Sequence, residues 1–310
     1  MANYRDYVRR VASVKNTKKI TYAMKLVAAA KMKRAQDAAL TAREYTAELA
    51  NSLDKALSAG EFNPENIKLA QSKKTTSKIG LIVIGTNRGL CGGFNTNLNK
   101  KLDLALSELK ENFPEAKIEI TILSRKAAEY CRRRGHAYIE SYEELPEDPI
   151  NWPTKDIAQS LIKKFLNNEL DRAYILYSEF KSTLTQVPTL KQLLPFSFES
   201  LRSLSNTLGG ENEKNNSFQK IKNIKIIFEP DPQGVADNLM PKLVRSQILN
   251  AALEVKAGEY SSRMRAMDAA TRNANDLIKK LQLTANRLRQ SGITSQLLDI
   301  LGGAEALKEN

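Results

Sequence analysis

The chain begins with a long stretch that contains no helix-breaking residue. From about Tyr4 to Leu57 it has neither proline nor glycine. Ten of the 28 residues from Ala23 to Ala50 are alanine, the best helix former. A single helix is therefore expected here, ending before Gly60 and Pro64. At about 1.5 Å per residue it would be roughly 80 Å long, far longer than the three or four turns usual in a globular domain.

The last part of the chain has the same character and adds a heptad repeat. After the turn-like segment 229–234, residues 235–301 are interrupted only by Pro241, Gly258 and Gly292. Within this stretch eight residues follow one another at alternating spacings of three and four, which is typical of a coiled-coil seam. The seam residues are Met264, Met267, Thr271, Ala274, Ile278, Leu281, Ala285 and Leu288.

The N-terminal stretch offers a complementary stripe, with small residues that allow a partner helix to approach closely. The stripe is predicted to contain Ile20, Met24, Val27, Ala28, Met32, Ala35, Ala39, Ala42, Thr46, Leu49 and Leu53. The chain leaves and returns through the middle of the sequence. We therefore expect the terminal helices, over residues 1–60 and 229–310, to pair as a long antiparallel coiled coil, with the intervening domain at one end.

The middle of the chain alternates segments typical of strands and helices, after a linker over residues 61–77. Strands are predicted at 79–85, 117–123, 173–177 and 224–228, and helices at 96–112, 126–134 and 154–168. This alternation predicts a Rossmann-like βαβ domain over residues 78–228, with a largely parallel sheet. The polar segment 197–223 is interpreted as a flexible loop. The fold class is therefore α/β plus a long antiparallel coiled coil.

The chain is strongly basic, and most of the excess charge lies at its N-terminal end. Lysine plus arginine total 48 against 35 acidic residues, which leaves a net charge of +13. Residues 1–36 hold ten of these bases and one acid, and so carry +9. The charge suits an acidic protein surface, a nucleic acid or an anionic membrane. Composition does not choose between such a partner and a solvated helix face, and no nucleic-acid motif accompanies the bases.

Few residues are available for catalysis or metal binding. The chain has one histidine, His136, and two cysteines, Cys91 and Cys131, whose spacing matches no metal or redox motif. No catalytic constellation, metal site or cofactor site is predicted. No apolar run reaches the roughly 20 residues that a membrane-spanning helix needs.

One glycine-rich segment stands where phosphate-binding loops usually lie. Gly85–Asn95 follows a predicted strand and precedes a predicted helix, but it lacks the Gly-Lys-Ser/Thr ending of a P-loop and the GxGxxG spacing. A tight turn that packs the helix onto the sheet is the preferred interpretation. An α/β nucleotide-binding enzyme with a coiled-coil appendage remains an alternative function. A basic coiled-coil adaptor for nucleic acid is another.

Seven blocks of sequence together resemble the gamma subunit of F-type ATP synthases. They run in the order of that family across essentially the whole chain, and their combination is highly specific. The blocks are Val14–Lys31, Arg88–Asn95, Gln186–Pro195, Phe228–Pro232, Ser262–Thr271, Asn286–Thr294 and Ile300–Ala304.

The resemblance implies a non-catalytic rotor subunit of the central stalk, present once in each complex. In that family the helix pair lies inside a ring of three alpha and three beta subunits, and the α/β domain lies near the epsilon subunit and the membrane c-ring. Rotation driven by protons or sodium ions is coupled to ATP synthesis or hydrolysis on the beta subunits. No cofactor and no nucleic acid are expected for such a subunit. Since no signal or transit segment is recognised, the expected location is peripheral, on the cytoplasmic side of a bacterial inner membrane.

The resemblance also implies contacts with the beta subunits. Met24 and Lys25 match the helix segment near the acidic lever of a beta subunit, and Arg263 matches their counterpart in the C-terminal helix. The positions matching those that engage a beta catch loop are Arg289, Gln290 and Thr294. Arginine makes directional hydrogen bonds that would persist in only some rotational states, so that different angles favour different beta conformations.

Overall fold

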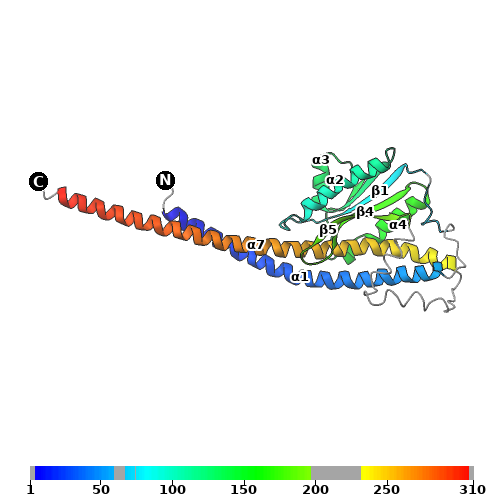
Figure 1. Cartoon of the computed structure of the whole chain (residues 1–310), viewed down its shortest axis with the longest axis horizontal. Coiled ribbons are helices and arrows are strands. Elements are labelled where there is room, and N and C mark those ends of the chain that lie inside the picture. Colours follow the sequence, from blue (N-terminus) through cyan, green and yellow to red (C-terminus); the bar gives the residue numbers. More distant parts are fainter. Residues whose placement is uncertain (1–3, 59–66, 74, 197–231, 307–310) are drawn as a thin grey trace. The chain divides into compact units, whose positions relative to one another are not determined.

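The structure of the chain is a computed structural model that describes residues 4–58, 67–73, 75–196 and 232–306 (Figure 1). Two long helices, α1 (Tyr4–Ser58) and α7 (Pro232–Ala306), are the first and last elements along the chain. The five strands of a single sheet lie between them in sequence. The predicted fold class, an α/β domain together with paired terminal helices, is confirmed. The predicted loop 197–223 and the predicted strand 224–228 lie outside the described residues.

The chain divides into two compact units, which are described separately. The first unit combines Met1–Ala29 with Arg263–Asn310, and the second unit is Ala30–Ser262. The sequence-based division into 1–60, 61–77, 78–228 and 229–310 follows the helices instead. In the structure each terminal helix contributes one part to each unit.

In the first unit α1 and α7 run antiparallel. Thr21 Oγ1 lies 2.9 Å from Thr271 Oγ1, and one turn further along α1 the Lys25 ammonium lies 2.6 Å from Asp268 Oδ1, one turn back along α7. The α7 residues of the repeat face inward. Buried members are Met267, Thr271, Ala274, Ile278 and Ala285, and half-buried members are Met264, Leu281 and Leu288.

The α1 side of this seam differs from the sequence prediction at two positions. Ile20 and Val27 are 60% and 56% exposed and do not lie in the seam. The inward positions continue the three-and-four spacing back from the buried Ala28. They are Lys25, Thr21, Lys18, Val14 and Val11, of which Val11 is buried and the others half-buried. The prediction chose apolar residues at this end of α1, whereas the seam accepts lysine and threonine here because Asp268 and Thr271 supply polar partners.

The sheet of the second unit has the strand order β3-β2-β1-β4-β5. Its strands are β1 (Lys78–Ile84), β2 (Lys117–Leu123), β3 (Glu140–Ser141), β4 (Arg172–Phe180) and β5 (Gln186–Leu194). The pairs β1–β2, β1–β4 and β2–β3 are parallel, whereas β4 and β5 form an antiparallel hairpin. The prediction of a largely parallel sheet therefore holds for four of the strands.

The two faces of the sheet are covered by different helices, and β1 shows why. Its residues Leu81 and Val83 pack under α2 (Phe94–Asn112) and α3 (Arg125–Arg134), because alternate side chains of a strand point to opposite faces. Ile82 and Ile84 point the other way, into the larger core. That core contains α4 (Thr154–Leu166) and the second-unit parts of α1 and α7. Both faces are covered, as expected for an apolar parallel strand.

The sequence missed β5 and misjudged the predicted linker. The strand β5 contains Pro188 and several polar residues, which obscure a strand pattern but are tolerated at the edge of a sheet. Within the predicted linker 61–77, Ile67 and Leu69 are buried in the larger core, and the Phe196 amide donates to the Leu69 carbonyl at 3.0 Å. Part of this segment is therefore core structure.

Asp171 fixes the start of β1 beside β4. Its Oδ2 accepts hydrogen bonds from the Ser77 and Lys78 amides at 2.8 and 2.9 Å, and its Oδ1 lies 3.1 Å from the Lys73 ammonium. Burial by itself would raise the pKa of this carboxyl. The hydrogen bonds from Lys78, Ser77 and Lys73 outweigh burial and lower the pKa from 3.8 to about 2.

Replacing Asp171 with asparagine is expected to lower the free energy of unfolding of the second unit by about 2 kcal/mol at pH 7. Because the folded-state pKa is depressed, this stabilisation is fully present above the unfolded pKa of 3.8 and is lost as the pH falls towards about 2. Urea titrations of the full chain between pH 7 and pH 2 should therefore show the two proteins converging at the acid end. A constant difference in stability across that range would contradict this assignment.

Candidate functional site

The residues that the resemblance assigns to beta contacts fall into two groups along the first unit. In the first group Met24 is half-buried, Lys25 pairs with Asp268, and Arg263 is only 8% exposed. The Lys25 hydrogen bond, assisted by the charge of Arg272, lowers the pKa of Asp268. Within this chain Lys25 is thus half-buried against Asp268 of α7, and Arg263 is buried.

The second group lies further along α7 and is exposed. Arg289, Gln290 and Thr294 all face solvent, and the Thr294 hydroxyl donates to the Gln290 carbonyl at 3.0 Å within the helix. Large apolar side chains around and beyond them are also at least half exposed. These are Ile293, Leu297, Leu298, Ile300 and Leu301. A helix end with charged, polar and apolar groups all exposed is typical of a surface that a partner covers.

The exposed apolar residues of α7 do not make it a membrane span. None of the helices that the structure describes has a window apolar enough to cross a lipid bilayer. The same described ranges contain no group of three histidine, cysteine, aspartate or glutamate side chains that could hold a metal ion.

The glycine-rich loop forms hydrogen bonds with residues at the starts of α2 and α3. The Ser124 hydroxyl donates to the Thr86 carbonyl at 2.7 Å, and Thr86 Oγ1 lies 2.8 Å from Asn95 Oδ1. A Cβ on Gly85 would lie 2.8 Å from Ser124 Oγ, which explains why this position needs glycine. The loop therefore uses its polar groups to join β1 to its neighbours, as the packing interpretation predicts.

Cys131 and His136 take part in the packing of α3. Cys131 is fully buried, and burial raises the pKa of its thiol to about 11, so it is not a thiolate at neutral pH. His136 Nε2 lies 2.9 Å from Asp103 Oδ1, and Asp103 also accepts a hydrogen bond from the Tyr130 hydroxyl. This cluster joins the end of α3 to α2.

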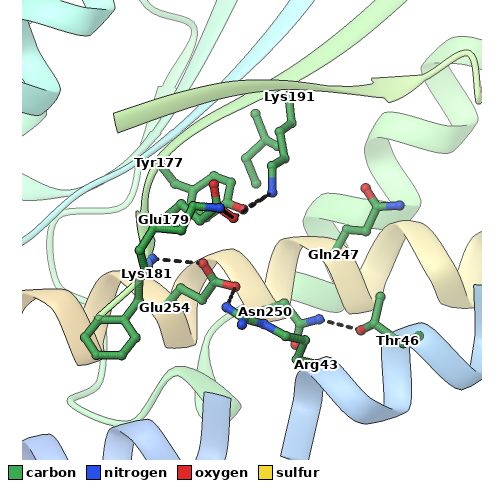
Figure 2. Close-up of a pocket in the computed structure, with 12 residues that line it drawn as sticks. Arg43, Thr46, Tyr177, Glu179, Lys181, Lys191, Gln247, Asn250 and Glu254 are labelled. Atoms are coloured by element: carbon green, nitrogen blue, oxygen red, sulfur yellow. Dashed lines mark hydrogen bonds and ion pairs between the residues drawn. The ribbon is translucent and has the colours of Figure 1, made fainter. Parts of the chain in front are cut away.

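Charged side chains also join the sheet of the second unit to its helices. They line a cavity of about 210 Å³ between α1, α7, β4 and β5, shown in Figure 2. Glu254 Oε1 lies 2.8 Å from the Arg43 guanidinium, and Glu254 Oε2 accepts the Phe180 amide at 3.1 Å. Burial opposes the charge of Arg43, but the hydrogen bond to Glu254 and the nearby negative charges of Glu254 and Glu179 together outweigh it and raise the arginine pKa. The carboxylate therefore joins three elements at once.

A second charged cluster connects the loop before α4 to the same helices. Glu147 accepts hydrogen bonds from Lys31 of α1 and from the Tyr260 hydroxyl of α7, and these bonds lower its pKa. Trp152 is buried nearby, with the Lys256 ammonium 5.9 Å from its ring centroid. Lys256 also lies 3.3 Å from Glu259. Lys256 and Glu259 are buried, whereas Lys31 and Glu147 remain partly exposed to solvent.

Sequence reasoning missed both charged clusters. Glu254, Lys256 and Glu259 look like ordinary solvated helix charges, yet every residue from Ala251 to Ser262 is buried. A usable signal was present in Gly258, a helix-interior glycine among these charges. A Cβ there would lie 2.8 Å from Phe94 Cε2 and 3.1 Å from Gln186 Cγ, which marks close packing on α7.

The fold defines a class of protein in which an antiparallel pair of terminal helices accompanies an α/β domain. The ATP synthase family model (ATP-synt) matches residues 3–307. The chain is 37% identical over 309 residues to the ATP synthase gamma chain of Pelotomaculum thermopropionicum, covering 99% of this chain and all of that one. It is 40% identical over 312 residues to the gamma chain of Hyphomonas neptunium, with the same coverage. The chain belongs to the ATP synthase gamma chain family.

Solved structures show the same fold at lower sequence identity. The rotor of the Euglena gracilis mitochondrial ATP synthase in rotational state 1 contains a chain with a TM-score of 0.58 and 18% identity, covering 94% of this chain and 98% of that one. A chain from the central stalk and c-ring of the Tetrahymena thermophila mitochondrial ATP synthase has a TM-score of 0.53 and 22% identity. It covers 81% of this chain and 99% of that one.

Proposed function

We propose that this chain is the central-stalk rotor subunit of an ATP synthase, and that it has no catalytic site of its own. It would couple rotation of an ion-driven c-ring to conformational changes in the catalytic beta subunits. The observation that carries the proposal is the family match over residues 3–307. The alternative of a nucleotide-binding enzyme loses its main support, because the glycine-rich loop uses its polar groups in packing.

The first unit offers the physical means for such coupling. Exposed Arg289, Gln290 and Thr294 can hydrogen-bond to a beta subunit in some orientations and lose those bonds in others. Exposed Ile20 and Val27 add apolar surface on α1. A rotor whose contacts differ around its axis binds the conformations of a beta subunit with different free energies, and that difference is the source of torque. Met24, Lys25 and Arg263 would act from within the helix pair, through its local geometry and charge.

The proposed partners follow from the assemblies that contain the similar chains. The similar chains come from a rotor, from a central stalk with its c-ring, and from an assembly of F1 with a c-ring. For this chain we propose three alpha and three beta subunits around the helix pair, with the epsilon subunit and the c-ring as further contacts. One copy per complex would work at the cytoplasmic face of a bacterial inner membrane, as a peripheral subunit, with protons or sodium ions as the coupling ion.

Purification of the native complex tests the proposal. An affinity tag on this chain should recover alpha, beta, epsilon and c subunits, with alpha and beta each three times as abundant as the tagged chain. Vesicles that hold the complete complex should show ATP-driven ion pumping, and complex assembled without this chain should not. Full pumping in its absence would refute the proposed function.

A further inference from the structure

The hairpin between β4 and β5 lies on one face of α7. Ser261 Oγ donates to the Thr183 carbonyl at 2.6 Å, and Ser262 Oγ donates to Gln186 Oε1 at 2.8 Å. Together with Glu254 and Gly258, these serines lie at positions i, i+4, i+7 and i+8, which share one side of a helix. We call this set, Glu254, Gly258, Ser261 and Ser262, the docking face.

Glu254 connects the docking face to both of its neighbours. The residue is 6% exposed, and its two carboxylate oxygens bind different elements, Arg43 of α1 and the Phe180 amide at the end of β4 (Figure 2). Charge-assisted hydrogen bonds of this kind are roughly twice as strong as neutral ones. The hairpin is thereby held to the two helices together, and not to α7 alone.

Gly258 sets how closely the hairpin approaches the helix. Its backbone lies against Phe94 of α2 and Gln186 of β5, with no room for a Cβ. Since β5 is an edge strand of the sheet, its outer side depends on contacts outside the sheet for support. The docking face contacts the turn end of the hairpin, at Phe180, Thr183 and Gln186, over more than two turns of α7.

We propose that the docking face is the attachment through which turning force passes between the sheet domain and the helix pair of the second unit, with Glu254 as its positioning residue. The inference rests on the proposed function, because only a rotor must carry force across this junction. A torque about the helix axis pushes the hairpin sideways around α7. The hydrogen bonds of Glu254, Ser261 and Ser262 oppose that displacement, and the close contact at Gly258 blocks it sterically.

The test compares ion pumping with ATP hydrolysis in complexes purified with Glu254→Gln or Gly258→Ala. Glutamine keeps the size of the side chain but removes its charge and one of its two acceptor oxygens. Alanine at 258 would clash with the Phe94 ring and crowd the Gln186 side chain of the hairpin, which disturbs the close contact with the helix. In both variants we expect the number of ions pumped per ATP hydrolysed to fall at least threefold, while hydrolysis stays within twofold of the unmodified complex. Hydrogen exchange of the amides in 180–186 should become at least tenfold faster.

Glu129→Gln is the matched control, because it removes a carboxylate of the same unit that pairs only within α3, with Lys126 at 2.7 Å. It should leave both the pumping ratio and the hydrogen exchange of 180–186 unchanged. A variant that merely unfolds the domain would reduce the amount of assembled complex and its hydrolysis together. Ser262→Ala, which removes the hydrogen bond to Gln186 Oε1, provides a milder variant if either main substitution prevents assembly.

Two results separate this inference from the proposed function. In the first, the unmodified complex pumps normally, and every docking-face variant assembles with normal subunit stoichiometry and pumps as many ions per ATP as the unmodified complex. That result would overturn the role of the docking face and leave the rotor function intact. Pumping that does not require the chain at all would overturn the rotor function itself.

Discussion

Replacing Trp152 with alanine is expected to lower the free energy of unfolding of the second unit by about 3–5 kcal/mol, the usual cost of removing a buried aromatic side chain. The indole is 5% exposed, and its Nε1 donates to the Pro146 carbonyl at 2.8 Å. Its ring also covers the ammonium of Lys256, itself only 9% exposed. The substitution therefore leaves a cavity and removes a cation–π partner in a poorly solvated place.

Urea unfolding followed by circular dichroism would measure this loss. Trp152 is the only tryptophan of the chain, so its fluorescence can follow the unmodified protein in parallel. Trp152→Phe keeps an aromatic ring for Lys256 but loses the hydrogen bond to Pro146, and should cost only about 1 kcal/mol. Ile150→Ala is the matched surface control, because Ile150 lies in the short helical turn (Pro149–Asn151) that directly precedes Trp152 and is 64% exposed. If alanine at 152 costs no more than alanine at 150, the loop before α4 does not anchor the helices.

The helix pair could be predicted from sequence because its signal extends over many turns. Eight seam positions of α7 repeat without a break, and a pattern of that length tolerates local exceptions. The two errors on α1, Ile20 and Val27, come from choosing apolar residues at this end of the helix. Extending the three-and-four spacing back from Ala28 leads to Lys25 and Thr21, whose partners Asp268 and Thr271 lie almost 250 residues away in sequence.

The parts of the fold that the sequence did not predict depend on tertiary contacts. The strand β5 has a weak local pattern and exists because β4 pairs with it on one side. Ile67 and Leu69 look like linker residues until the larger core is known. The charges at Glu254 and Glu147 likewise have no local motif, since their partners come from α1, β4 and α7. The resemblance supplied the predicted contact residues of the first unit, but it gave no information about these junctions.

Removing the polar groups of the exposed helix end is expected to abolish most coupled activity without affecting folding. In the double variant Arg289→Ala with Gln290→Ala, we expect ATP synthesis by the assembled complex to fall at least tenfold. A hydrogen bond to a charged group contributes about 1.5–3 kcal/mol, and a difference of 1.4 kcal/mol between two rotational states changes their relative populations tenfold. Both side chains face solvent in the first unit, so their loss should leave the chain's own packing intact.

Lys280→Ala is the matched control for this double variant, since it removes an exposed positive charge from the same helix at a position outside the predicted contact set. It should preserve ATP synthesis within twofold, and all variants should unfold at the same urea concentration as the unmodified chain. Thr294→Ala should give a smaller loss than the double variant, because it removes one neutral hydrogen-bonding group. Equal synthesis rates for the double variant and the Lys280 control would show that the end of α7 contributes only bulk and charge to coupling, and that directional hydrogen bonds from Arg289 and Gln290 are not its basis.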